Sequence, residues 1–116
     1  MKINFRDNHI VKDVDITIID ISGNIKTNED YDSFKKAIDE VLDKGCVNVL
    51  LNFKDVNFIN SSGLGRLILA SKRIIEDKGS LKITELSDDL RELFTFTRLD
   101  SKIPVFATEN EAIKSF

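Results

Sequence analysis

Val47-Asn48-Val49-Leu50-Leu51-Asn52-Phe53 is a nearly continuous apolar run. A β-strand has this composition when other parts of the protein cover both of its faces. The segment before it predicts a helix, because apolar residues recur there at helical spacing: Tyr31, Phe34, Ile38, Val41 and Leu42. Thr27 and Asp30 favour the start of this helix, and Gly45 favours its end.

A second strand is indicated before this helix. Val14–Ile21 reads VDITIIDI, which is β-branched and roughly alternating, and Gly23 would end the strand. A strand, a helix and a further strand in this order form a crossover unit, in which the two strands are parallel and the connection is right-handed. Ile3–Val11 predicts a preceding hairpin arm, with Lys12 and Asp13 in the turn.

The same alternation continues toward the C-terminus. The sequence predicts a helix from Asn60 to about Lys78, a strand over Ser80–Thr84, a short helix from Ser87 or Asp88, a strand over Ile103–Phe106 and a terminal helix opened by a capping-box pattern at Thr108–Glu111. This order predicts an α/β fold with a mixed, mostly parallel sheet of about four to five strands and about four helices.

Length and composition argue against several classes of protein. A chain of 116 residues has the size of one domain (1–116), and 41% hydrophobic with 32% charged residues is typical of a globular protein. No apolar run approaches the roughly 20 residues of a membrane-spanning helix. The N-terminus does not resemble a signal peptide, so we expect a cytoplasmic protein that does not bind membranes.

The charge and the rare residues argue further against nucleic acid, metal and cofactor binding. The net charge of -3 gives no basic surface to displace the counterions of a nucleic acid. Cys46 and His9 are each the only residue of their type, so neither a disulfide framework nor a His/Cys metal site is available. We expect His9 to be a solvated hairpin residue and Cys46 to fill space near a strand.

The stretch Asn60-Ser61-Ser62-Gly63-Leu64-Gly65 is the candidate functional segment. Its first three residues are all favoured at helix N-caps, so the simplest interpretation is that one of them caps the helix. However, each glycine in a first helical turn costs up to about 1 kcal/mol relative to alanine. Gly63 and Gly65 would instead provide a surface without side chains beside a serine hydroxyl, where another chain could approach closely.

An enzymatic role for this stretch is weakly supported. A nucleophilic Ser61 or Ser62 needs a base within hydrogen-bond reach, His9 lies in the first hairpin, and the G-x-S-x-G elbow is absent. A phosphate-binding loop would need the lysine of the P-loop motif. We therefore expect no catalytic residue, although a helix N-terminus with glycines attracts anions and leaves an anion- or nucleotide-binding role as an alternative.

The other side of this helix carries a possible docking patch. The inward face is expected to consist of apolar residues and one serine at helical spacing: Leu64, Leu67, Ile68, Ser71, Ile74 and Ile75. Leu69 lies roughly opposite, on the side of Arg66 and Arg73. An exposed leucine between arginines is compatible with protein docking.

The segment Val56–Gly65, VNFINSSGLG, resembles the signature of STAS-domain proteins, specifically the bacterial anti-sigma factor antagonists. That signature reads roughly hydrophobic-x-F-hydrophobic-D-S-S-G-L-G. The resemblance covers the whole chain through the alternation of elements and the glycine after the second strand. The match of the tail around Leu99-Asp100 is weaker.

The resemblance implies a partner switch controlled by phosphorylation. In the family, an anti-sigma factor with a histidine-kinase-like ATPase domain phosphorylates the first serine of the signature, and a PP2C-type phosphatase restores it. The unmodified antagonist binds that factor and frees the sigma factor. On this chain the resemblance implies Ser61 as phosphoacceptor, with docking neighbours Asn60, Ser62, Gly63, Leu64, Gly65, Arg66, Leu69, Asn24 and Lys26.

The sequence departs from the family pattern at several of these positions. Asn60 stands where the family usually has aspartate, Asn24 and Lys26 fall in what is often a Gly-Glu-hydrophobic-Asp run, and Arg98 replaces a common glycine. A STAS module that is not phosphorylated and serves as a scaffold subunit of a larger complex is therefore a further alternative.

Overall fold

The computed structural model describes residues 1–11 and 13–116, except for the side chains of Asp7, Asn8, His9 and Val11. The strands are β1 (Lys2–Val11), β2 (Val14–Ile25), β3 (Asn48–Ile59), β4 (Ser80–Thr84) and β5 (Val105–Phe106). The helices are α1 (Asn28–Asp43), α2 (Ser61–Glu76), α3 (Asp88–Phe96), the 3₁₀ turn η1 (Leu99–Ser101) and α4 (Glu109–Lys114). The predicted order of elements is confirmed, with η1 as an addition.

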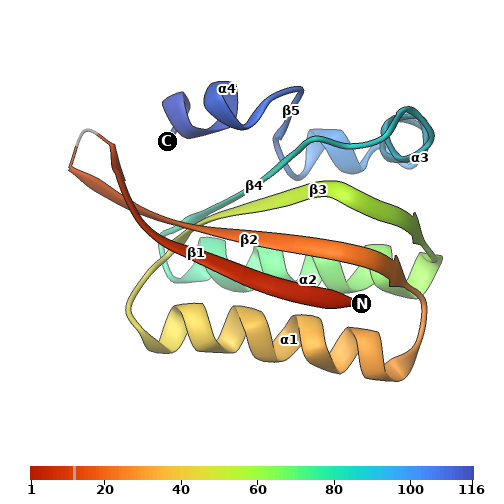
Figure 1. Ribbon diagram of the computed structural model, residues 1–116, viewed down its shortest axis with the longest axis horizontal. Helices are drawn as coiled ribbons and strands as arrows, with labels where there is room; N and C mark the ends of the chain where they lie inside the picture. The colour runs from red at the N-terminus through yellow and green to blue at the C-terminus, as the bar shows by residue number, and fades with distance from the viewer. Residues whose placement is uncertain (12) are drawn as a thin grey trace.

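The five strands form one sheet in the order β1-β2-β3-β4-β5 (Figure 1). β1 pairs antiparallel with β2, in a register that places Ile3 opposite Ile21, and every other neighbouring pair is parallel. The mixed, mostly parallel α/β fold is thus confirmed. Because β2, β3 and β4 are parallel, their carboxyl ends meet at one end of the sheet, where open α/β folds place their sites.

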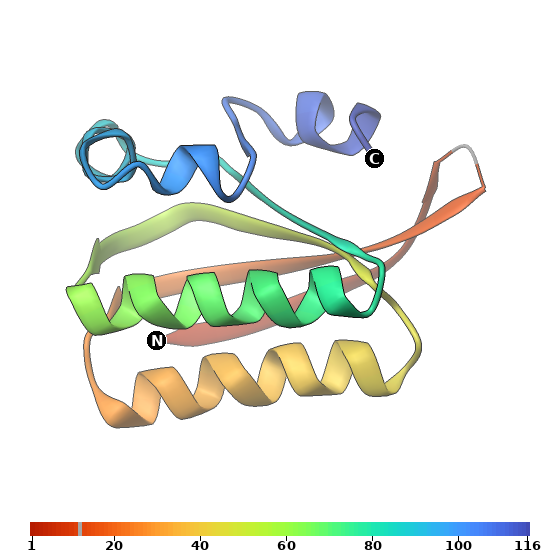
Figure 2. The ribbon, with the colours of Figure 1, turned by 180° about the vertical axis from the view of Figure 1, so that it is seen from behind.

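Helices cover both faces of the sheet (Figures 1 and 2). α1 and α2 lie on one face, where alternate strand residues such as Ile19 and Leu51 join the larger core. The intervening residues Ile18 and Leu50 point to the opposite face and pack with Ala112 of α4. Burial on both faces explains why the central strands read as continuous apolar runs.

The two central strands are longer than the sequence indicated. β2 does not end at Gly23 but continues to Ile25, and β3 does not end at Phe53 but continues to Ile59. The additional segments pair with each other through Gly23 with Val56 and Ile25 with Ile59, across irregularities in register. These bulges disturb the strict alternation, which is why the pattern suggested a loop.

Helix α2 differs from the prediction on one face and at its end. Ile75 was expected to face the core, but it is 58% exposed, whereas Ile74 is fully buried. The helix ends at Glu76, and Lys78 then adopts a left-handed backbone with φ of 66°. Ile75 follows a core position directly, so the rotation of about 100° per residue turns it toward solvent.

The edges of the fold differ in smaller ways. The last strand begins at Val105 rather than at Ile103. Ile103 precedes the strand, and its side chain is buried in the core. The prediction of a turn at Lys12 and the prediction of a solvated His9 side chain fall outside the described residues.

Candidate functional site

Asn60 occupies the point where β3 ends and α2 begins. Its Oδ1 atom accepts hydrogen bonds from the backbone N–H of Gly63 (2.8 Å) and from the hydroxyl of Tyr31 (2.8 Å). Its Nδ2 atom donates to the carbonyl oxygen of Lys26 (3.2 Å), and its backbone N–H donates to that of Ile25 (3.1 Å). Asn60 is therefore the N-cap of α2 and also joins α2 to the start of α1 and the end of β2.

This geometry explains why an asparagine is suited to the position where the family usually has aspartate. The Nδ2 group is a donor, and a carboxylate has none. An aspartate would place an oxygen against the Lys26 carbonyl that now accepts from Nδ2. The asparagine that departs from the family pattern thus makes a hydrogen bond within this chain that an aspartate could not make.

Ser61 and Ser62 are the first two residues of α2, and both are exposed. The first turn of α2 contains no acidic residue. Unlike Asn60, the two serines do not cap the helix, so their side chains are not required for its start. The exposure of Ser61 leaves its hydroxyl accessible from solvent.

The two glycines of the stretch have different roles. A Cβ at Gly63 would lie 2.6 Å from Cγ1 of Ile59 and 3.2 Å from the carbonyl oxygen of Ile25. Gly63 is buried, and the interpretation that it forms a bare docking surface is wrong, because it is needed for close packing of α2 on the strand ends. A Cβ at Gly65 would meet nothing within 4 Å, so only Gly65 matches that interpretation.

Leu64 belongs to the core rather than to the surface. Its side chain is 8% exposed and packs in the larger cluster between the sheet and the helices. A partner could therefore contact little of it without rearrangement. This burial fits the inward face that the helical spacing predicted.

Asn24 and Lys26 lie near the start of α2, as the resemblance implied. Asn24 pairs with Phe58 across β2 and β3, and Lys26 is linked to Asn60 through its carbonyl oxygen. Lys26 is exposed, and Phe58 is 49% exposed.

Tyr31 was predicted as a core residue, and the structure gives it a second role at the site. Its ring is 7% exposed, but its hydroxyl reaches Asn60, and the guanidinium of Arg66 lies 5.4 Å from the ring centroid. A tyrosine rather than phenylalanine at a buried helix position was the available signal, because a buried tyrosine hydroxyl usually has a partner.

Arg66 and Leu69 face away from the sheet, next to α1. Leu69 is 58% exposed, as its position opposite the core predicted. Together with Arg73 both residues line a hollow of about 110 Å³ between α1 and α2. The structure therefore separates the predicted docking residues into a tip around Ser61 and a lateral hollow.

Arg98 has a left-handed backbone conformation, with φ of 60° and ψ of 23°. Glycine adopts this conformation without the steric cost that a Cβ adds. A glycine, which the family commonly has at this position, would suit this backbone, and Arg98 adopts it despite its Cβ.

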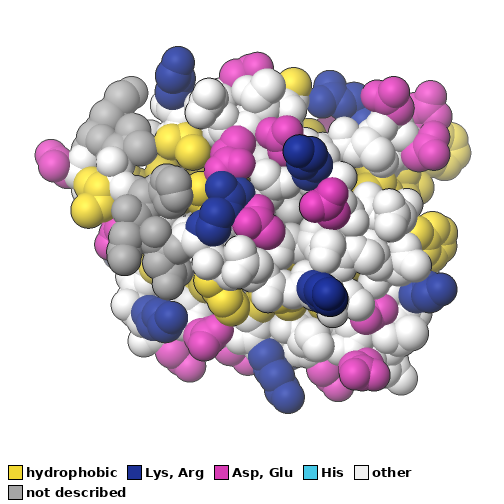
Figure 3. All heavy atoms as spheres, in the orientation of Figure 1, with side chains coloured by type: hydrophobic (Ala, Val, Ile, Leu, Met, Phe, Trp, Pro, Cys, Tyr) yellow, Lys and Arg dark blue, Asp and Glu magenta, His cyan; other side chains and the backbone are white. Residues whose placement is uncertain are grey.

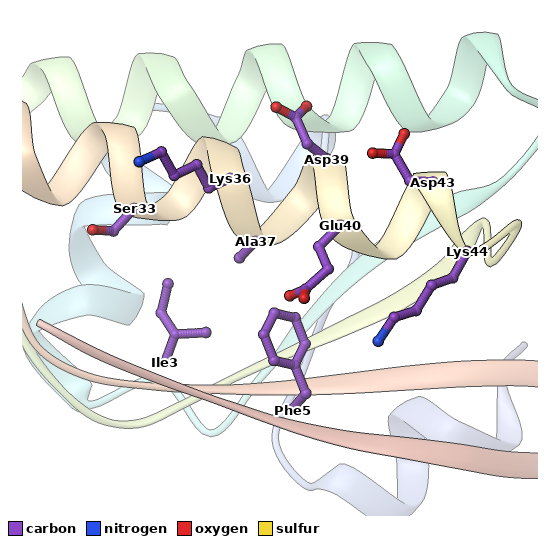
Figure 4. Close-up of a pocket in the computed structure, with 9 residues that line it drawn as sticks. All are labelled: Ile3, Phe5, Ser33, Lys36, Ala37, Asp39, Glu40, Asp43 and Lys44. Carbon is purple, nitrogen blue, oxygen red and sulfur yellow. The ribbon is translucent and has the colours of Figure 1, made fainter.

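A larger hollow of about 660 Å³ lies between β1 and α1 (Figure 4). Phe5 and Ile3 of β1 face α1 there, beside charged residues of both signs such as Glu40 and Lys44. The Lys44 ammonium lies 6.0 Å from the centroid of the Phe5 ring. None of the residues predicted from the sequence for docking or phosphorylation lines this hollow.

Two further observations concern the surface. Basic and acidic side chains are interspersed over the described part of the face in Figure 3, so neither sign dominates there. In the described ranges 1–11 and 13–116, no helix has both the length and the apolar character to cross a membrane.

A family model and a curated relative show the family of this chain. The family model of the STAS domain matches residues 8–112. The chain is 30% identical over 106 residues to a proposed anti-sigma factor antagonist of Thermotoga neapolitana, covering 90% of this chain and 91% of that protein.

Two solved structures illustrate the similarity in fold. The crystal structure of a proposed anti-sigma factor antagonist of Thermotoga maritima has a TM-score of 0.80 at 26% identity, covering 97% of this chain and 92% of that one. The Bacillus cell fate determinant SpoIIAA in its phosphorylated form has a TM-score of 0.67 at 21% identity, covering 97% and 98% of the two chains.

Proposed function

The chain belongs to the STAS domain family, among its anti-sigma factor antagonists, and we propose that it is a partner switch controlled by phosphorylation of Ser61. Unmodified, it binds an anti-sigma factor that carries a histidine-kinase-like ATPase domain. That factor phosphorylates Ser61 and is released, and a PP2C-type phosphatase restores the binding form. The chain itself is a regulator rather than an enzyme.

The observation that supports this proposal most is the exposed Ser61 at a helix start capped by another residue. Asn60 supplies the capping oxygen to Gly63, so modification of Ser61 removes no hydrogen bond that the helix start requires. A phosphate adds a charge of about -1.5 to -2. The N-terminal end of a helix dipole tolerates that charge, and the first turn of α2 contains no acidic residue to repel it.

Phosphorylation of Ser61 would lower the affinity for the partner. A doubly charged group on the tip would have to be desolvated beneath a docked protein, whereas a free hydroxyl would not. A loss of about 1.4 kcal/mol lowers affinity tenfold, so a penalty of a few kcal/mol is sufficient for a switch. Asn24, Lys26, Asn60, Ser62 and Gly65 lie around the tip and are the proposed contacts there.

The test uses the purified chain with an anti-sigma factor of the histidine-kinase-like ATPase type. After incubation with ATP, we expect the intact mass of the wild type and of Ser62→Ala to rise by one phosphate, and that of Ser61→Ala to stay unchanged. Phosphorylation of Ser61→Ala, or of neither serine, would contradict the proposal.

Binding provides the second part of the test. Ser61→Asp should leave the circular dichroism spectrum and melting curve nearly unchanged and weaken binding to the same factor at least tenfold. Ser33→Asp is the matched control, because it adds the same charge at an exposed serine of α1 that is not among the proposed contacts. Equal weakening by both variants would show a general charge effect rather than a switch at Ser61.

A scaffold function without phosphorylation is the second candidate. It is favoured by Asn60, which stands near the tip where the family usually has aspartate and donates a hydrogen bond to the Lys26 carbonyl oxygen. A scaffold would keep its complex whatever residue stands at position 61, so the Ser61→Asp measurement separates the two functions.

A further inference from the structure

A second candidate surface lies along the side of the molecule, between α1 and α2. Phe34 and Ile38 of α1 and Ala70 of α2 form its floor, and all three are buried. Leu69 forms a wall and remains 58% exposed. We call this hollow the interhelical notch.

The size of the notch restricts what can enter it. Its volume of about 110 Å³ is far below the roughly 300–1,000 Å³ of pockets for drug-sized ligands. An apolar cavity of about 150 Å³ accommodates a group the size of benzene. The notch therefore fits one apolar side chain.

The rim of the notch is cationic but unevenly neutralised. Arg73 donates a hydrogen bond to Asp39, and the Lys35 ammonium lies 3.5 Å from the other carboxylate oxygen of Asp39. Asp39 thus pairs with both cations at the end of the rim that is further from the start of α2, where one positive charge remains in excess. The hydrogen bond from Arg73 holds the pKa of Asp39 below its ordinary value, so this carboxylate stays ionised at neutral pH.

Arg66 is at the other end of the rim. Its guanidinium stacks against the Tyr31 ring, 5.4 Å from the centroid, and its side chain is exposed. Among the described residues, no carboxylate forms an ion pair with Arg66. This contact holds the guanidinium beside the ring and leaves it without a carboxylate partner among the described residues, and such an arginine suits a carboxylate from another molecule.

We propose that the interhelical notch docks an acidic segment of a partner protein, which inserts one leucine or phenylalanine against Leu69 and pairs a neighbouring carboxylate with Arg66. The apolar side chain covers Leu69 and the buried floor, and it supplies most of the affinity. The carboxylate selects against basic segments and sets the orientation, because Arg66 is the rim cation that has no carboxylate partner among the described residues, whereas Arg73 and Lys35 share Asp39. Ser61 is not among the residues that line the notch.

The probe is a displayed library of random 12-residue peptides, selected on the Ser61→Ala variant so that phosphorylation plays no part. The same library is selected separately on an Arg66→Glu variant, and the two sets of enriched peptides are compared. We expect the enriched peptides to share one Leu or Phe with Asp or Glu within four residues of it. Enrichment without acidic residues, or no dependence on Arg66, would overturn the proposal.

Affinity measurements with an enriched peptide then define the contact. Arg66→Glu and Leu69→Ala should each weaken binding at least tenfold, and so should replacing the acidic residues of the peptide with lysine. Lys72→Glu is the control, because Lys72 is exposed on α2 but does not line the notch. It should change the affinity less than twofold.

Other occupants give distinct results. If a second copy of the chain fills the notch, the protein will self-associate at high concentration, and Arg66→Glu will abolish the association. That result, or peptide binding whose amide shift changes lie away from α1 and α2, would overturn the proposal of an acidic partner segment. Either result leaves the Ser61 experiments unaffected, since they measure phosphate transfer and binding at the tip.

Discussion

The starts of α1 and α2 lie at the same end of the molecule, and both helices pack on the same face of the sheet (Figure 1). α1 begins with a capping box: Thr27 accepts from the backbone N–H of Asp30 (3.1 Å), and Asp30 accepts from that of Thr27 (3.1 Å). Glu29 and Asp30 place negative charge in its first turn. α2 has no acidic residue there, contains two glycines and is capped by Asn60.

The two helix starts solve the same physical problem by different means. Each must satisfy the N–H groups of its first turn. α1 does so with residues adjacent in sequence, and its charges suit the helix dipole. α2 relies on contacts with Tyr31 and Lys26, which come from other elements. The start of α2 is thereby held without the serines, and they remain free for another role.

The largest expected effect concerns the close packing of α2. Gly63→Ala should destabilise the fold by about 1–3 kcal/mol, because the added methyl overlaps Ile59 and approaches the Ile25 carbonyl oxygen. Gly65→Ala is the matched control: its methyl enters open space, and removing a helical glycine should stabilise by up to about 1 kcal/mol. Denaturant unfolding of both variants measures the difference. Equal shifts of the same sign would show that Gly63 does not fix the packing.

A smaller difference is expected between the two caps. Asn60→Ala should cost about 1–3 kcal/mol, since it leaves the Tyr31 hydroxyl and the Gly63 N–H without their acceptor. Thr27→Ala removes a single exposed capping bond and should cost about 1 kcal/mol. Asn60→Asp should cost less than Asn60→Ala, because it keeps the acceptor for Tyr31 and Gly63, although it replaces the donor to Lys26 with an oxygen. Thermal unfolding of the variants measures these stability losses. A larger loss of stability for Thr27→Ala than for Asn60→Ala would contradict the interpretation of the helix starts.

The smallest effect is a pH dependence restricted to α1. Hydrogen bonds from the Lys26 backbone N–H and from Thr27 lower the pKa of Asp30 below its ordinary value of 3.8. Because the folded pKa is depressed, the stability that Asp30 contributes is present above that ordinary value and is lost as the pH falls through the lowered one. Asp30→Asn should therefore flatten the pH dependence of unfolding between about pH 5 and pH 2.

Asn60 provides the control for this pH effect. Its amide does not titrate in that range, so Asn60→Ala should shift the stability curve without changing its slope over those pH values. A change of slope equal to that of Asp30→Asn would contradict the assignment to α1.

The elements that repeat a local pattern were predictable from sequence. Thr27 and Asp30 marked the start of α1, the run from Val47 to Phe53 marked a central strand, and the exposed position of Leu69 followed from helical spacing. The predictions failed where the strand alternation or the helical spacing of apolar residues is interrupted. The bulges between β2 and β3 hid their full length, and the step from Ile74 to Ile75 at the end of a helical face was misassigned.

The candidate site likewise has features that local sequence predicted and features that only the structure revealed. The sequence alone determined that α2 begins within Asn60–Ser62, because capping preferences act over a few neighbouring residues, but it left open which of the three residues is the cap. Only the tertiary structure decided that Gly63 is a packing residue, that Tyr31 holds the cap, and that Arg66 borders a notch with α1. These roles depend on distances between elements that are far apart along the chain, and local sequence does not encode such distances.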